Sequence, residues 1–147
     1  MLALRARAQV VETPLDEIAA SDIDLFTEGG CHILAREIET ISGWPIHCFS
    51  AGAGDRLPRY HAFVVPAPGW RLDVEGCSPA HMHEQRWGFW NGCEHKRFPY
   101  EQIAHSWGPV LAPTSEAWAL TRSRALAPLL VELACDMMSG DESPDLG

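Results

Sequence analysis

The stretch EGGCHILA (28–35) places two glycines before a cysteine at the point where a helical pattern begins. Between Cys31 and Ser42, apolar residues recur at the spacing of one helix face: Cys31, Leu34, Ala35, Ile38 and Ile41. This spacing predicts an amphipathic helix over 31–42. Gly43 can end the helix, and Pro45 prevents it from continuing. The cysteine is therefore expected at the first turn of a helix, on the face that turns toward the core.

A cysteine in that place has three possible roles: nucleophile, metal ligand or core residue. A helix N-terminus favours a thiolate through its unpaired N–H groups and its dipole. Gly29 and Gly30 would allow a sharp turn and the close approach of a substrate to the backbone. The Cys31 amide, or the Trp44 indole, could then donate to an oxyanion. Against this, free cysteines are among the most buried residues. His32 is expected on the polar face, because consecutive helical residues diverge by about 100°.

The bulk composition favours one compact, globular domain. The chain has 147 residues, of which 46% are apolar, and a formal net charge of −9. We expect a single domain over 1–139 and a disordered acidic tail, GDESPDLG, over 140–147. The negative charge disfavours nucleic acid as a partner.

The sequence also favours a cytoplasmic protein with reduced thiols. No run is long and apolar enough to span a membrane, and the N-terminal residues lack the apolar core of a signal peptide. There are five cysteines, and an odd count without an export signal fits free thiols better than a disulfide framework. We therefore expect no membrane association. The oligomeric state stays open.

The middle of the chain predicts a β-hairpin. The runs YHAFVV (60–65) and WRLDVEG (70–76) flank PAPG (66–69), a proline-glycine turn between two β-rich segments. The remaining expected elements are a short helix after Thr13, a linking segment over 21–30, a strand over 44–50, a loop over 51–59, a short helix over 99–108 and a helix over 114–140, capped by Thr114 or Ser115 and kinked or broken at Pro128. The order predicts an α+β fold, in which the Cys31 helix packs on a small antiparallel sheet and further helices follow.

The hairpin brings a histidine and an acid close together. Counting outward from the turn places His61 roughly opposite 73–74, and cross-strand neighbours lie ~5 Å apart. A carboxylate on Asp73 could therefore orient the imidazole of His61. A slip of one residue in the register would turn Asp73 to the other face.

At these residues the chain resembles a known group of enzymes. GGC entering a helix, then HAFVV, then LDVEG is similar to the transglutaminase-like branch of the papain-like cysteine fold and to small bacterial and phage proteins with that core. The resemblance covers roughly 27–76. It implies that Cys31 is the nucleophile, His61 the general base and acid, and Asp73 the group that orients the base. It further implies a cysteine-dependent hydrolase or acyltransferase, needing no cofactor, that acts on an amide or acyl bond of a peptide, protein or small molecule.

A second group of residues offers a different function. A C-x3-H-x-H and a C-x-H pattern contain ligands suited to zinc or copper: Cys77, His81, His83, Cys93 and His95. The paired C-x2-C and H-x3-H spacings of established zinc modules are missing, so a packed or solvated histidine loop is the favoured interpretation. His81 and His83 could also border the cleft. The alternatives to an enzyme are thus a non-catalytic binding protein of the same fold and a structural zinc domain built on 77–95.

Overall fold

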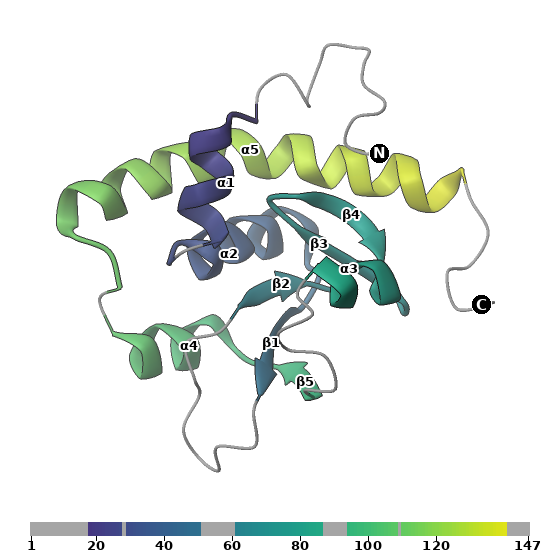
Figure 1. The fold of residues 1–147 in the computed structure, drawn as a ribbon, viewed down its shortest axis with the longest axis horizontal. Coiled ribbons are helices and arrows are strands. Elements are labelled where there is room, and N and C mark those ends of the chain that lie inside the picture. Colours follow the sequence, from purple (N-terminus) through teal and green to yellow (C-terminus); the bar gives the residue numbers. More distant parts are fainter. Residues whose placement is uncertain (1–17, 28, 51–60, 87–93, 109, 141–147) are drawn as a thin grey trace.

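Within the described residues, five strands form a single antiparallel sheet, with helices packed against it (Figure 1). The computed structural model describes residues 18–27, 29–50, 61–86, 94–108 and 110–140. The elements in chain order are α1 (Ala20–Thr27), α2 (Cys31–Ser42), β1 (Ile46–Ser50), β2 (Ala62–Val64), β3 (Trp70–Asp73), β4 (Gly76–Pro79), α3 (Ala80–Arg86), β5 (Glu94–Arg97), α4 (Tyr100–Trp107) and α5 (Pro113–Ser139). The predicted mixed α+β class is confirmed.

The sheet has the order β4-β3-β2-β1-β5. The predicted hairpin is β2 and β3, in which Val64 pairs with Leu72. Leu72 also pairs with Cys77 of β4, so β3 has a partner on each side. The strand expected over 44–50 is β1, which joins β2 to β5. β4 and β5 were not predicted, because the histidine- and tryptophan-rich segment 77–100 shows no clear alternation.

Helix α2 occupies the centre of the packing and contacts both α5 and β2. Figure 1 shows α5 running along one side of the molecule, past α1 and α2. Strand alternation turns one face of the sheet toward these helices. Its buried members include Ile46, Cys48, Ala62, Val64, Trp70, Leu72 and Cys77. The predicted packing of the Cys31 helix on a small antiparallel sheet is therefore confirmed.

The opposite face of the sheet has a different composition. The same alternation gives it Phe49, Phe63 and a set of polar side chains: His47, His61, Arg71, Asp73 and His95. Phe49 and Phe63 pack with their ring centroids 5.2 Å apart. The face is therefore an aromatic layer that encloses charged and polar groups.

Several local predictions are wrong. Residues 21–30, expected to be a linker, mostly form α1, whose Asp22 accepts the N–H of Ala19 and pairs with Arg122 of α5. Helix α5 begins at Pro113 with Ala112 at the N-cap, rather than at Thr114 or Ser115. It also continues through Pro128, so of the two predicted effects of this proline, a kink or a break, the break is wrong.

Other predictions have mixed outcomes. The helix over 31–42 and its end at Gly43, which has a φ of 79°, are confirmed. The short helix expected over 99–108 is α4. Ile41 was expected to be buried but is 51% exposed. Most of the helix expected after Thr13, the whole loop over 51–59 and all but the first residue of the tail 140–147 lie outside the described residues. None of the described helices has the length and apolarity to cross a membrane.

Candidate active site

The two glycines before α2 are required by the fold. Gly29 has a φ of 140°, a conformation that side chains disfavour. A Cβ added to Gly30 would lie 2.9 Å from the carbonyl oxygen of Leu25. The ring of Phe26 lies on the same side. Helix α1 therefore fills the space beside Gly30, and the expected approach of a substrate to that glycine is wrong.

Cys31 occupies the first position of α2. No side chain caps this helix, so the positive end of its dipole faces the first turn. The Cys31 side chain is buried, and its Sγ accepts the backbone N–H of Ala62 at 3.3 Å. Trp44 follows the opposite end of this 12-residue helix, about 18 Å along the axis. The suggestion that its indole serves as an oxyanion donor is therefore wrong.

His61 and Asp73 form a buried pair. Nε2 of His61 lies 2.9 Å from Oδ2 of Asp73, and the other carboxylate oxygen accepts the N–H of Glu75 at 2.9 Å. His61 is fully buried, and its carbonyl accepts the Phe49 N–H at 3.3 Å, which anchors it beside β1.

The register explains why this contact forms. Counting back from the pair of Val64 and Leu72 places His61 across from Glu75, so His61 and Asp73 are diagonal neighbours on the same face. The predicted contact is present, and the register differs by one to two residues from the predicted placement of His61 roughly opposite 73–74. Residues two apart along a strand lie on the same face of the sheet, so Asp73 still reaches His61 although its partner in the register is Glu75.

The ionisation of the three groups favours a thiolate beside an imidazolium. Burial raises the pKa of Cys31, but hydrogen bonds from His32 and His61, the His61 charge and the Ala62 N–H outweigh it and lower the pKa to about 6. Burial lowers the pKa of His61, but the Asp73 hydrogen bond and the Cys31 thiolate raise it to about 9. The Asp73 pKa lies well below its ordinary value, because bonds from His61 and His83 overcome the effect of burial.

Two imidazoles are near the thiolate, and we assign the cation to His61. The carboxylate of Asp73 holds one nitrogen of His61, which leaves its Nδ1 for Cys31. His32 also bonds the thiol, but no hydrogen bond or ion pair among the described residues joins His32 to a carboxylate. His32 is nevertheless buried, 5.0 Å from the Trp107 ring and 6.2 Å from that of Tyr100. Its expected place on a polar face is wrong, because α4 covers that side of α2.

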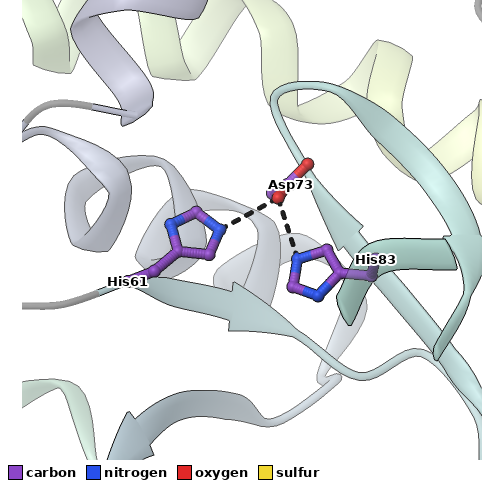
Figure 2. A group of neighbouring side chains, drawn as sticks. All are labelled: His61, Asp73 and His83. Carbon is purple, nitrogen blue, oxygen red and sulfur yellow. Dashed lines mark hydrogen bonds and ion pairs between the residues drawn. The ribbon is translucent and has the colours of Figure 1, made fainter. Parts of the chain in front are cut away.

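A second histidine on Asp73 was not identified from the sequence as part of this site. Nε2 of His83, from α3, lies 3.1 Å from the same Oδ2 that His61 contacts. Figure 2 shows the two imidazoles converging on the carboxylate from different elements. His83 is fully buried, and its Nδ1 lies 3.4 Å from Nη1 of Arg71. The only sequence signal for it was the C-x3-H-x-H pattern, which suggested a metal or a cleft border.

The alternative metal ligands have separate environments. Cys77 is buried on β4, where burial and the Asp73 charge raise its pKa to about 12. His81 is exposed. His95 contacts Nη2 of Arg71 at 2.9 Å, and Cys93 lies outside the described residues. Within the described part of the chain, the group of donors close enough to share a metal ion is instead His61, Asp73 and His83.

The surroundings of Nδ1 of His83 and the contact lengths to Asp73 fit a hydrogen-bonded cluster better than a metal centre. A histidine that binds a metal normally donates its other N–H to a carboxylate or carbonyl. Nδ1 of His83 faces Arg71, a guanidinium that can only donate. Metal binding through Nε2 would then leave His83 without a proton on either nitrogen. The contacts of 2.9 and 3.1 Å to Asp73 are also ordinary hydrogen-bond lengths.

A scan of protein-family models, a search of curated proteins and a search of solved structures each gave no match to this chain. The evidence for function therefore comes from the chemistry of the site.

Proposed function

We propose that this protein is a cysteine-dependent hydrolase or acyltransferase, with Cys31 as nucleophile, His61 as general base and acid, and Asp73 as the group that holds His61. The observation that carries this proposal is a buried chain of contacts, in which the Cys31 thiol bonds His61 and Nε2 of His61 lies 2.9 Å from the Asp73 carboxylate; the lowered pKa of the thiol agrees with it. A nucleophile, a base and an orienting group in mutual contact are the parts that covalent acyl transfer requires.

The arrangement of elements supports a papain-like, transglutaminase-like core. Cys31 begins a helix, His61 precedes β2, and Asp73 ends β3, the antiparallel neighbour of β2. This is the order in which the resembling enzymes carry their catalytic residues. A peptide, a protein or a small amide or ester is the corresponding substrate class, and we expect the reaction in the cytoplasm.

The proposed reaction has two halves. The Cys31 thiolate attacks the acyl carbonyl, and Nδ1–H of His61 gives its proton to the departing amine or alcohol as the thioester forms. Water or a second amine then attacks the thioester while His61 takes up the proton, which releases the acyl product and restores the thiolate. Asp73 keeps the imidazole in one orientation throughout. The Cys31 N–H, at the start of α2, is placed to donate to the oxyanion.

The direct test is to trap the thioester with p-nitrophenyl acetate. We expect a burst of p-nitrophenol and one acetyl group on the peptide that contains Cys31. Cys31→Ala should abolish both, whereas Cys77→Ser should retain them. Addition of glycinamide separates transfer from hydrolysis, because a transferase forms the acetylated amide. Acetylation spread evenly over the cysteines, or unchanged in His61→Ala, would rule out the proposed function.

A further inference from the structure

Asp73 accepts hydrogen bonds from two imidazoles at a single oxygen. Oδ2 lies 2.9 Å from Nε2 of His61 and 3.1 Å from Nε2 of His83, as Figure 2 shows. The second oxygen is occupied by the N–H of Glu75. All described partners of the Asp73 carboxylate are therefore donors. Their directions fix the orientation of the carboxylate plane relative to the His61 ring.

Arg71 determines which nitrogen of His83 carries the proton. Nη1 of Arg71 lies 3.4 Å from Nδ1 of His83. A guanidinium has donors only, so Nδ1 must be the acceptor. The single proton of a neutral imidazole is then on Nε2, where it is donated to Asp73. Arg71 is itself held by Oε2 of Glu84 at 2.8 Å and by Nε2 of His95 at 2.9 Å.

The other groups around His83 also favour its neutral form. From β3 it faces the anion of Asp73 and the cation of Arg71, and from the residue before β2 it faces His61, a second cation. β1 and β2 contribute the apolar rings of Phe49 and Phe63. Burial is the largest effect and lowers the His83 pKa. The hydrogen bond and charge of Asp73 raise this pKa, and the two cations lower it.

We propose that His83, a neutral imidazole whose proton the Arg71 contact keeps on Nε2, is a positioning residue that holds Asp73 in the orientation that His61 needs. The role rests on the proposed function, because it acts on Cys31 through Asp73 and His61. A neutral donor is suited to it: it fixes the carboxylate without adding a positive charge that would compete with His61. A cationic His83 would weaken the attraction between Asp73 and His61 and so raise the pKa of Cys31.

The protonation of His83 can be read directly by two-dimensional NMR of the imidazole nitrogens in the wild-type protein. Between about pH 7 and 8 we expect the neutral form of His83 with its proton on Nε2, while His61 is doubly protonated. In Arg71→Met, His83 should take up its second proton at a higher pH than in the wild type, because one of the two cations that oppose it is gone. Arg86→Met is the matched control, because Arg86 bonds Ser78 and Glu75 and neither histidine. A cationic or Nδ1-protonated His83 in the wild type would overturn the proposal.

The effect on the thiol is measured by the pH dependence of Cys31 alkylation by iodoacetamide. His83→Leu removes the donor, and we expect the midpoint to move up by about one pH unit, which is about a tenfold loss of rate near pH 5. His83→Gln keeps an N–H donor and should remain within about threefold of the wild type. His81→Leu is the control, because His81 is exposed on the same helix. Equal losses in the Leu and Gln variants would contradict the positioning role.

The two measurements separate the two proposals. A neutral, Nε2-protonated His83 together with an unreactive Cys31 would remove the proposed function. A reactive, His61-dependent Cys31 whose midpoint is the same in His83→Leu would retain the proposed function and remove the role of His83.

Discussion

Cys31 and Cys77 are equally buried, each 5% exposed, yet the pKa of Cys31 is about 6 and that of Cys77 about 12. Burial raises the pKa of both thiols and therefore does not distinguish them. The difference comes from their neighbours. Cys31 accepts hydrogen bonds from His32, His61 and the Ala62 N–H and lies near the His61 charge, whereas the negative charge of Asp73 opposes the ionisation of Cys77.

One carboxylate therefore has opposite effects on the two cysteines. Asp73 keeps His61 protonated, which favours the Cys31 thiolate through the imidazolium. The same charge opposes a thiolate on Cys77. A buried cysteine is thus a poor indicator of function until the charge facing its sulfur is known.

The largest change in this comparison should come from His61→Ala. Without the imidazolium, only the hydrogen bonds from His32 and Ala62 still oppose the effect of burial, so the Cys31 pKa rises from about 6 toward its ordinary value of 9. A full return to 9 would lower the thiolate fraction at pH 7 from about nine tenths to about one hundredth, so alkylation should slow by up to about 100-fold. Peptide-resolved mass spectrometry measures this rate. His105→Ala, at an exposed position of α4, should leave it unchanged.

A smaller change, in opposite directions at the two thiols, is expected in Asp73→Asn. Cys31 should react about tenfold more slowly, because the His61 pKa falls when its carboxylate partner is lost. Cys77 should react faster at alkaline pH, because the charge that opposes its ionisation is gone. Glu75→Gln is the matched control. If both cysteines slowed together, the comparison would reflect a loss of structure.

The thiolate–imidazolium pair should have little effect on how the free energy of unfolding depends on pH. Cys31 with a lowered pKa stabilises the fold above about pH 9 and loses this contribution as pH falls through 6. His61 with a raised pKa stabilises it below about 6.5 and loses this contribution as pH rises through 9. The two slopes cancel, because the folded and unfolded pairs bind nearly the same number of protons.

Urea unfolding across pH tests this cancellation. The free energy of unfolding should be nearly flat from about pH 7 to 9. Below about pH 6.5 it should fall, first because His47, His83 and His95, whose pKa values are lowered in the fold, take up protons in the unfolded chain, and in stronger acid because Asp73 is protonated. It should also fall above about pH 9, where unfolded Cys77 ionises but folded Cys77 does not. Cys77→Ser should reduce the alkaline fall. A steep slope through neutral pH that disappears in Cys31→Ala would contradict the paired pKa values.

The smallest effect on the comparison is expected from a change in packing. Leu72 is fully buried and pairs with both Val64 and Cys77. Leu72→Ala should lower the free energy of unfolding by about 2–5 kcal/mol. The ratio of Cys31 to Cys77 alkylation at pH 7 should stay within about threefold, because the charges facing the sulfurs are unchanged. If the two cysteines of Leu72→Ala were alkylated at similar rates, the difference between their pKa values would come from burial and not from the neighbouring charges.

The parts of the site that could be predicted are those governed by local periodicity. The spacing in 31–42 located Cys31 at a helix start, and a proline-glycine turn between β-rich runs placed His61 near Asp73. Because side chains alternate with a period of two along a strand, the contact between His61 and Asp73 forms even though the two residues are diagonal neighbours. These signals depend on a few neighbouring residues, so one sequence contains them.

The parts that could not be predicted depend on distant packing. His83 reaches Asp73 because β4 leads directly into α3, and neither element has a clear pattern in the sequence. His32 is buried only because α4 returns to cover α2. Gly30 suggested an approach path for a substrate, but it serves the contact with α1, whose residues read as a polar linker.

The contrast between the two thiols is tested most directly by the pH profile of iodoacetamide alkylation, resolved for Cys31 and Cys77 in the same wild-type sample. We expect a Cys31 rate with a midpoint near pH 6 and a plateau through neutral pH, while Cys77 stays unreactive until strongly alkaline pH. A Cys31 rate that rises only near pH 9, or in parallel with Cys77, would contradict it.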